Sequence, residues 1–546
     1  MERTIQRPPV RVIFLAAAAL FALFLVLPMG SILWQSLAGD GTVGLAFYAD
    51  VLARQGFGTA FCNSVLLSAA SGLLTTALAF LLAYTVNYTR LPGWAGRLIR
   101  ALAVLPMLLP TITYGFAIIY SFGRQGLITM LLGGRQFFDI YGPAGLLMGY
   151  TIYTLPVSFL LIDNTMGYID KKFMIVSRAM GDSRWRSFRT TVLTPLFGTF
   201  AASFIQSFTL CFTDYGIPTS VGGNTPLMAT LLYGEMLGSL PNFHTGSAVA
   251  IAMLLPSVAG ILLLAWLERY NVRYNKISRV ELDKNPVRDG VCAALSAVVL
   301  LAVLSVFLVI FIVPFVDQWP YRLQPSAAHA AAVFADPALM QVYRNSLLVA
   351  VLTAVLGTLV VYGAALVSAR GAAGRPEGRV LDAIALVTST IPGMVLGVAY
   401  LLTFKGTPLQ NSFPLIILCN VVHFFSSPYL MMKNGLEKLS ASWETTARLM
   451  GDSWLKTVVR IITPNAFSTL LEVFGYYFTN AMVTVSAVIF IAGAHTMVIT
   501  AKIKELQHFA NFNEIFVLSI LILATNLAAK GLFRLFSHRL TQIERD

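Results

Sequence analysis

The sequence predicts an all-α integral membrane protein with about twelve transmembrane helices, built as two parallel copies of a six-helix unit. Hydrophobic residues make up 57% of the 546 residues and charged residues only 12%, about half the charged fraction of a soluble domain. Many apolar stretches reach the roughly 18 residues that a helix needs to cross a bilayer. Short patterns also recur at fixed separations between the two halves of the chain. Together these observations predict a duplicated, membrane-spanning fold.

The apolar stretches predict where each transmembrane helix lies. Several of them contain prolines, which membrane helices tolerate when neighbouring groups satisfy the freed carbonyls. These prolines include Pro106, Pro110, Pro156, Pro256 and Pro392. The twelve spans are expected near residues 12–34, 61–85, 98–121, 143–162, 192–213, 244–267, 291–315, 346–368, 380–403, 414–432, 464–488 and 514–535.

The basic residues predict the orientation of the chain. The formal net charge is +13, which raises the question of nucleic-acid binding. With the N-terminus in the cytoplasm, the predicted cytoplasmic segments hold 30 of the 38 Lys and Arg residues and the outer loops hold 8. This bias follows the enrichment of Lys and Arg in cytoplasmic loops. We therefore expect a multi-pass membrane protein, surrounded by lipid, with both termini cytoplasmic and no nucleic-acid partner.

Cysteine and histidine give no sign of a metal or catalytic centre. The four cysteines lie in or beside apolar segments, and none has CxxC spacing. The six histidines are dispersed, and each is expected to be a packed or interfacial residue. His423 alone lies well inside a predicted span, where an ionisable group can also contact a transport pathway. We expect no catalytic residues, no metal site and no resident cofactor.

Matching positions in the two halves define the repeat. Four pairs lie 282 residues apart, and the tetrapeptide MGDS at 180–183 recurs 270 residues later. The pairs are Asn63-Ser64 and Asn345-Ser346, Arg97 and Arg379, Pro110 and Pro392, and Gly115 and Gly397. A repeat with an even number of spans gives both copies the same orientation, with a seam between them. We expect a first half at 1–267, a polar cytoplasmic linker at 268–290 and a second half at 291–546.

The two MGDS copies fall in long polar loops, 163–191 and 433–463, on the predicted cytoplasmic side. Each loop is expected to form a short helix, a break at glycine, and a second amphipathic helix that ends at Thr-Pro. Gly181 and Gly451 can adopt the positive φ that ends a helix, and the Asp or Ser after each can cap the next helix. Such a helix fits a groove on a partner and the lipid interface equally well. Its occurrence in both halves favours a partner that is itself paired.

These loops resemble the cytoplasmic EAA signature of permease subunits of binding-protein-dependent ABC importers, which reads Glu-Ala-Ala, then a glycine and a later Leu-Pro. Thr445-Thr446-Ala447 stand at the EAA positions of the second loop, with Glu444 one residue earlier, and Ile175-Val176-Ser177 stand there in the first. Both loops have Thr where the family prefers Leu before Pro, and the interval from glycine to proline is one residue longer in the first loop. The resemblance implies that the loops couple to an ATPase through Arg178, Ala179, Gly181, Asp182, Trp185, Ala447, Arg448, Gly451, Asp452 and Trp454.

The resemblance covers nearly the whole chain and implies a type I ABC importer permease with both halves fused. No GxxxxGK[ST] phosphate loop occurs in the sequence, so ATP would be bound by a separate partner subunit. The family implies a location in the bacterial cytoplasmic (inner) membrane, two copies of a cytoplasmic ATPase, one on each MGDS loop, and an extracytoplasmic binding protein that delivers the solute. The nearest kin are ferric-iron, thiamine and 2-aminoethylphosphonate permeases. Residues 482–506 look closest to the phosphonate type, which predicts import of an organophosphonate, with ferric iron or thiamine as the alternative.

Polar residues in or beside the fifth and eleventh spans are candidates for the transport pathway, because these spans follow the MGDS loops and would flank the seam. They are Gln206, Asp214, Glu472 and Asn480. A carboxylate in hydrocarbon costs about 2.5–3.5 kcal/mol, so Glu472 should face protein or water. An interhelical hydrogen bond is slightly favoured for Glu472, and a pathway role for Asp214. The stretch 214–243 has no Lys or Arg. It is expected either to form a loop that dips back or folds over the pathway, or to lack basic residues only because outer loops generally avoid them.

Two other classes of protein are less consistent with these features. An ion-driven secondary transporter can also have parallel halves. However, the paired loops and the near absence of intramembrane carboxylate pairs favour an ATP-driven importer. A membrane enzyme or an assembly scaffold has no supporting residues. The sequence therefore predicts a transport subunit and not an enzyme.

Overall fold

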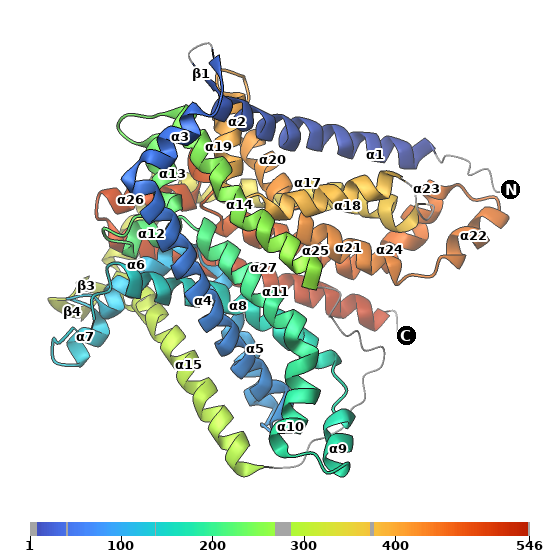
Figure 1. Cartoon of the computed structure of the whole chain (residues 1–546), viewed down its shortest axis with the longest axis horizontal. Coiled ribbons are helices and arrows are strands. Elements are labelled where there is room, and N and C mark those ends of the chain that lie inside the picture. The colour runs from blue at the N-terminus through green and yellow to red at the C-terminus, as the bar shows by residue number, and fades with distance from the viewer. Residues whose placement is uncertain (1–7, 40–41, 137, 268–284, 372–375, 544–546) are drawn as a thin grey trace.

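The structure is a computed structural model that describes residues 8–39, 42–136, 138–267, 285–371 and 376–543 (Figure 1). Most of these residues are helical, which confirms the all-α prediction. The described strands form two short hairpins, β1 with β2 (Ala38–Gly39 and Thr42–Val43) and β3 with β4 (Val316–Gln318 and Arg322–Pro325). Most of the predicted linker 268–290 lies outside the described residues, and its last residues begin the seventh long helix.

The long helices follow the predicted spans in order. In the first half they are α1 (Pro8–Phe21) with α2 (Leu27–Leu37), α4 (Gln55–Tyr88), α5 (Gly93–Val104) with α6 (Thr111–Phe122), α8 (Pro143–Tyr168), α11 (Thr194–Thr213) and α14 (Phe243–Leu267). In the second half they are α15 (Pro286–Ile312), α17 (Pro337–Arg370), α18 (Pro376–Thr390) with α19 (Gly393–Phe404), α20 (Phe413–His423) with α21 (Ser426–Glu437), α25 (Phe467–Val483) and α27 (Phe512–Ile543). Eight helices of the described chain are long and apolar enough to cross a membrane, or eleven if each of three bent pairs is one span. The remaining predicted span, 464–488, corresponds to the 17-residue α25.

The third and ninth spans were predicted as single helices, and this is wrong because each breaks at its repeated proline. The chain turns by 106° between α5 and α6 and by 102° between α18 and α19. Pro110 and Pro392 stand at these breaks. Proline has no N–H to donate and drives the residue before it out of the helical region. Leu109 accordingly has an extended backbone, with φ −117° and ψ 149°.

Each half gives its first helix to the other half. α1 packs along α17 and α18, while α15 packs against α4, α5 and α6 (Figure 1). The Tyr400 hydroxyl donates to the Phe24 carbonyl at 2.6 Å, and the Ser296 hydroxyl donates to the Thr85 hydroxyl at 2.8 Å. The two halves are therefore interlocked through their membrane helices.

The repeated Asn-Ser pair of the first half anchors the segment that follows the fifth span. The Asn63 side-chain amide donates to the Pro226 carbonyl at 3.1 Å, and the Ser64 hydroxyl accepts from the Met228 N–H at 2.9 Å. These bonds fix the start of α13 (Met228–Leu237) against α4. The predicted stretch 214–243 thus folds into two short helices, α12 (Gly216–Val221) and α13.

The second half repeats this anchor. The Asn345 amide donates to the Met497 carbonyl at 3.0 Å, and the Ser346 hydroxyl accepts from the Ile499 N–H at 2.7 Å. These bonds fix the start of α26 (Ile499–His508). α13 and α26 are therefore equivalent elements in the two halves.

The repeated glycines allow close packing in the same region. A Cβ on Gly115 of α6 would overlap the side chain of Ser220 on α12, and a Cβ on Gly397 of α19 would lie 2.5 Å from the Ala487 carbonyl oxygen. α12, α13 and α26 lie at one end of the molecule, called the far end here, and the two MGDS loops lie at the other, called the loop end (Figure 1). The halves diverge toward the loop end.

Candidate functional site: the paired loops and the seam between the halves

The first MGDS loop is a helix–break–helix unit. α9 (Lys172–Ala179) ends where Gly181 takes a φ of +87° and the Asp182 N–H bonds the Ser177 carbonyl at 3.1 Å. This is the backbone pattern of a glycine-terminated helix. The Ser183 hydroxyl then accepts from the N–H three residues on, at 3.3 Å, and begins α10 (Arg184–Phe188).

The second loop repeats the same backbone. α22 (Ser442–Leu449) ends where Gly451 has a φ of +79° and the Asp452 N–H bonds the Ala447 carbonyl at 2.9 Å. Ser453 caps α23 (Trp454–Thr457) at 3.3 Å. The predicted positive φ at both glycines is confirmed, and serine is the cap. In both loops the Asp pairs with a basic residue four positions on: Asp182 with Arg186 at 3.0 Å, and Asp452 with Lys456.

The second helix of the first loop was predicted to end at Thr-Pro, and this is wrong: it continues through one wide π-helical turn, Arg189–Leu193, directly into α11. In the second loop the chain passes through a similar turn, Val458–Ile462, into the short helix α24 (Thr463–Asn465), which ends one residue after Pro464, and α25 begins after Ala466. The Thr194 hydroxyl donates to the Arg189 carbonyl at 2.9 Å, and the Thr463 hydroxyl donates to the Val458 carbonyl at 2.9 Å. The threonine before the proline thus adds a hydroxyl bond to the same carbonyl of the wide turn that its backbone N–H bonds.

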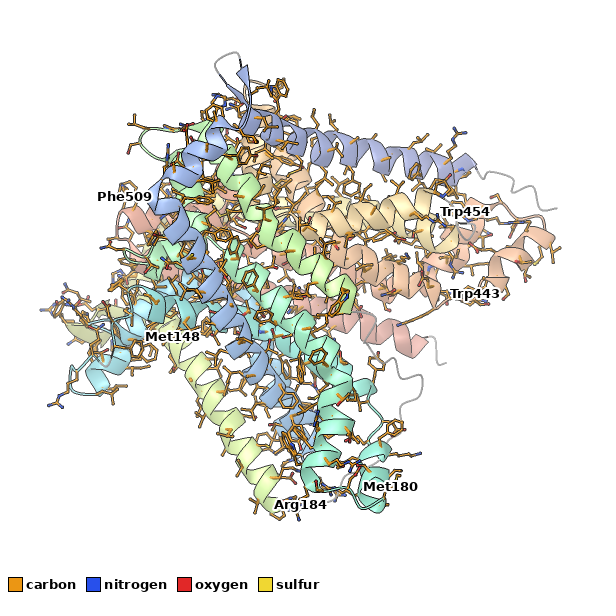
Figure 2. All side chains as sticks on the ribbon, in the orientation of Figure 1. Met148, Met180, Arg184, Trp443, Trp454 and Phe509 are labelled. Carbon is orange, nitrogen blue, oxygen red and sulfur yellow. The ribbon has the colours of Figure 1, made fainter. Side chains whose placement is uncertain are left out.

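Each loop presents exposed apolar side chains at its tip. Met180 is 80% exposed and Met450 is 78% exposed, and both stand beside exposed arginines, Arg178 and Arg448. Figure 2 shows Met180 and Arg184 at the tip of the first loop and Trp454 on the second. Other apolar side chains are exposed on the same loops, such as Val176 and Leu449, and a cluster of exposed apolar side chains is typical of a surface that contacts another protein or the membrane.

The tryptophans of the two loops differ in environment. Trp185 is 66% exposed and contacts Phe188, with 5.9 Å between ring centroids. Trp454 is half-buried and lines an apolar cavity of about 450 Å³ together with Ala17 and Leu20 of α1 and residues of α17. Because α1 belongs to the first half, the exchange of first helices covers one tryptophan of the pair.

The loops are also attached differently to the rest of the molecule. Glu444 of the second loop lies 4.0 Å from Arg370, which is 4% exposed, at the end of α17. Arg370 also donates to the Leu439 carbonyl at 2.9 Å. In the first loop, Met174 is buried instead, and Lys171 lies 5.7 Å above the Tyr88 ring. Burial lowers the pKa of Lys171, and Arg100 lowers it further.

The structure does not bring the four predicted pathway residues together. Gln206 of α11 and Glu472 of α25 are exposed, and no hydrogen bond joins Glu472 to another described residue, so its predicted interhelical bond is wrong. Asn480 donates to the Tyr476 carbonyl of its own helix at 2.8 Å. Asp214 is 7% exposed and accepts from the Ile217 N–H at 2.8 Å, which caps α12. Pathway roles for these residues stay predictions.

Residues that sequence reasoning missed meet across the seam at the far end. Lys504 of α26 lies 5.9 Å above the ring of Tyr215, which precedes α12 in the other half. The Gln507 side chain donates to the Thr219 carbonyl at 2.7 Å, also across the seam. Tyr215 stacks on Tyr233 of α13, with ring centroids 4.7 Å apart. The available signal was the presence of lysine in a predicted outer loop, against the positive-inside bias.

His423 lies at the 58° bend between α20 and α21. A Cβ on Gly393 would lie 3.1 Å from its Nε2, and its ring packs on Phe424 at 4.6 Å. This placement fits the packed role expected for it. No group of three or more metal-ligating side chains occurs in the described ranges.

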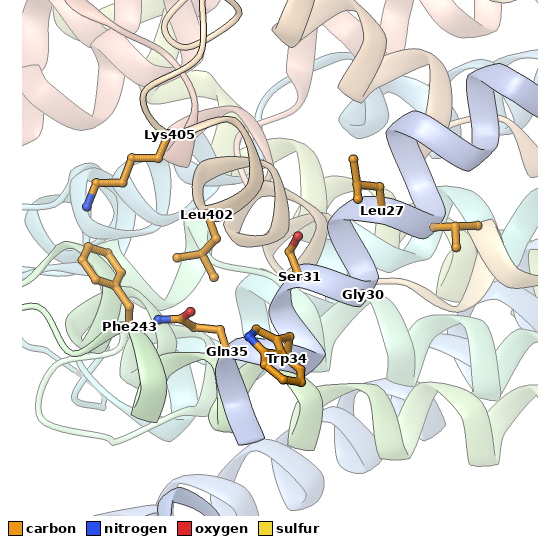
Figure 3. A pocket seen from close by; sticks show the side chains of 9 residues that line it. Leu27, Gly30, Ser31, Trp34, Gln35, Phe243, Leu402 and Lys405 are labelled. Atoms are coloured by element: carbon orange, nitrogen blue, oxygen red, sulfur yellow. The ribbon is translucent and has the colours of Figure 1, made fainter. Parts of the chain in front are cut away.

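An apolar hollow of about 740 Å³ lies between α2, α14 and α19 (Figure 3). Trp34, Gln35 and Lys405 line it beside leucines, and the Lys405 amine lies 4.9 Å above the Phe243 ring. Tryptophan and lysine together are typical of the membrane–water interface. We therefore assign this hollow to the lipid-facing surface and not to the solute route.

Comparison with known proteins identifies the chain. Residues 75–274 and 362–542 each match the family described as the inner membrane component of binding-protein-dependent transport systems. The chain belongs to this family. The permease therefore contains two fused copies of the family's domain, as the repeat predicted, and it is a multi-pass inner-membrane transport subunit and not an enzyme.

Curated relatives of the permease are distant. It is 25% identical over 461 residues to the ferric transport system permease protein FbpB of Actinobacillus pleuropneumoniae, covering 81% of this chain and 66%, about two thirds, of the relative. It is 23% identical over 452 residues to the thiamine transport system permease protein ThiP of Salmonella typhimurium, covering 81% of this chain and 79% of the relative. A crystal structure of a bacterial ABC transporter involved in import of the polysaccharide alginate aligns with 49% of this chain and 96% of its own, with 16% identity and a TM-score of 0.40.

Proposed function

We propose that the permease is the membrane subunit of an ATP-driven importer in which each MGDS loop docks one copy of a cytoplasmic ATPase. The observation that carries this proposal is the pair of loops with one backbone geometry, at one end of the molecule, each with an exposed methionine at its tip. Two equivalent docking sites suit a paired motor. The termini and both loops then lie in the cytoplasm, in accord with the distribution of Lys and Arg.

The loops are suited to transmit movement. Each one continues through its π-helical turn into α11 or toward α25, so a displaced loop moves the helix that follows it. Closure of the ATPase pair would bring the two diverging loop ends together and rock the halves about the seam. A solute delivered by an extracytoplasmic binding protein would enter at the far end and leave at the loop end.

Reconstitution tests this function. The permease, its ATPase and its binding protein are placed in liposomes, and ATP hydrolysis and solute uptake are measured together. We expect hydrolysis that rises with liganded binding protein and uptake that requires ATP. Uptake by the permease alone, driven by an ion gradient, would instead identify a secondary transporter.

For the solute we propose a small organophosphonate such as 2-aminoethylphosphonate, supported by the resemblance of residues 482–506 to phosphonate-type permeases. Ferric iron is the second candidate, because relatives named for ferric transport align over most of the chain. Thiamine is a further candidate. The test is titration of the partner binding protein with 2-aminoethylphosphonate, ferric ion and thiamine. Tight ferric binding without phosphonate affinity reverses the order.

A further inference from the structure

Lys504 is a cation at the seam with no acidic partner. It is half-buried, and no carboxylate of the described chain lies within 4 Å of its amine. Its amine bonds only a neutral group, the Gln507 amide oxygen, at 2.9 Å. Lys502, two residues earlier on the same helix, is paired with Glu505 at 2.7 Å. Partly burying an unpaired charge costs free energy, so Lys504 is retained at a cost to folding.

The groups facing Lys504 come from the other half of the permease. The ring of Tyr215 lies under the amine, and Tyr215 is 1% exposed. No described residue gives the buried Tyr215 hydroxyl a hydrogen bond of normal geometry. The carboxylate of Asp214, the residue before Tyr215, accepts from the Ile217 N–H and does not pair with Lys504. A donor without an acceptor therefore lies beside an unpaired cation, across the seam.

The repeat shows that this cation is not needed for the fold. The Ser64 and Ser346 anchors make Met228 and Ile499 equivalent, so the counterpart of Lys504 in the first half is Tyr233. α13 folds and packs with tyrosine at that position. Of the two equivalent helices, only α26 carries a cation at this position.

We propose that Lys504, with Tyr215 and Gln507, contacts the negative oxyanion group of the solute as it passes between the halves. This inference rests on the proposed import function and deepens it, because it assigns the solute a phosphonate or similar oxyanion. A lysine amine is a point charge that binds tetrahedral oxyanions. It repels ferric ion without bound anions, and it repels the thiamine cation.

Charge reversal tests the proposal in the reconstituted complex with 2-aminoethylphosphonate as the solute. We expect Lys504→Glu to reduce uptake at least tenfold, with Lys504→Arg within about threefold of the parent, since a cation remains. Lys502→Gln on the same helix is the matched control and should change uptake less than twofold. ATP hydrolysis stimulated by the liganded binding protein should stay within about twofold in all variants, so that solute moved per ATP falls only in Lys504→Glu.

A chemical rescue separates charge from folding. Cys62 is an exposed cysteine that the reagent would also modify, so the test uses a Cys62→Ser background. There, Lys504→Cys should lose uptake and regain at least a third of it after reaction with 2-aminoethyl methanethiosulfonate, which restores a cation. The negative sulfonatoethyl reagent should not restore it. Inorganic phosphate in excess should compete with the phosphonate in the parent if the oxyanion alone is recognised.

The outcomes distinguish the two levels of inference. Unchanged or increased uptake in Lys504→Glu, or equal rescue by both reagents, would overturn the oxyanion contact and leave the importer intact. Absence of any hydrolysis stimulated by the binding protein in the parent would overturn the proposed function itself.

Discussion

The two MGDS loops have the same backbone but are attached to the membrane helices by different means. Local residues produce the shared part: a glycine at positive φ, a serine cap and a Thr-Pro pair in both copies. The surrounding halves produce the difference. The first loop rests on buried Met174, while the second carries an ion pair between Glu444 and Arg370. The comparison teaches that duplication preserved the backbone of the proposed docking surface, while the contacts that attach it to the membrane helices diverged.

The exchange of first helices makes the two proposed docking surfaces unequal. α1 packs along α17 and covers Trp454, whereas Trp185 remains exposed on the first loop. We therefore expect the first loop to offer a partner one aromatic anchor that the second loop does not.

The largest effect is expected from substitutions that remove the feature the loops share, a glycine at positive φ. In the double variant Gly181→Arg and Gly451→Arg, both side chains would occupy a backbone region that strains them, at φ +87° and +79°. Uptake should be abolished while the membrane helices still insert. Measurement combines solute uptake with protease accessibility of the inserted chain. Asparagine at both positions is the control, since it tolerates this region and should keep most activity. Normal transport by the double arginine variant would remove the coupling role assigned to the loops.

The second prediction tests the ion pair that attaches the second loop to α17. Glu444→Gln leaves Arg370, which is 4% exposed, without its carboxylate. Removing one partner of a buried pair costs about 3 kcal/mol, so thermal stability should fall in detergent or nanodiscs. Glu472→Gln is the matched control, because that carboxylate is exposed and has no hydrogen bond among the described residues. Equal melting temperatures for Glu444→Gln and the control would show that the ion pair does not stabilise the folded protein.

The contrast between the shared backbone of the loops and the different contacts that attach them also explains what the sequence could predict. Hydropathy located the spans, and the glycine and serine at each MGDS located the helix breaks, because both signals are local. The breaks at Pro110 and Pro392 also had a local signal, the proline itself. However, hydropathy alone does not detect a bend of about 100° within an apolar stretch. The Asn-Ser repeat marked the duplication without revealing its role as an anchor.

The contacts that distinguish the halves are long-range and had no local signal. Arg370 and Glu444 lie 74 positions apart in the chain, and Lys504 meets Tyr215 across 289 positions. No spacing rule connects such residues, since helix exchange and seam packing decide them. Glu472 shows the converse: it was expected to bond another helix, and the packing leaves it exposed.

The third prediction tests the inequality of the docking surfaces. Trp185→Ala should weaken binding of the ATPase by about 2 kcal/mol, or roughly 30-fold in Kd, because exposed tryptophans that become buried are frequent interface anchors. Trp454→Ala should lower thermal stability by enlarging the cavity beside α1 and change the Kd much less. Surface plasmon resonance with the purified ATPase measures both. Equal losses of affinity in the two variants would mean that α1 moves aside on docking.

The smallest expected effect concerns the wide turns that join the loops to α11 and α25. Thr194→Val together with Thr463→Val removes a hydroxyl bond to the turn carbonyl in each half, and Thr463→Val also removes the 2.6 Å bond between the Thr463 and Tyr362 hydroxyls. Each loss should cost about 1 kcal/mol, since the backbone N–H of the same residue still bonds that carbonyl. Because the turn transmits loop movement, solute moved per ATP should fall while ATPase binding is unchanged. Thr209→Val is the control: its hydroxyl bonds the Ile205 carbonyl four positions back within α11, outside the wide turn. If the control lowers transport per ATP as much as the Thr-Pro variants do, the threonines act only on helix stability and the turns have no special part in coupling.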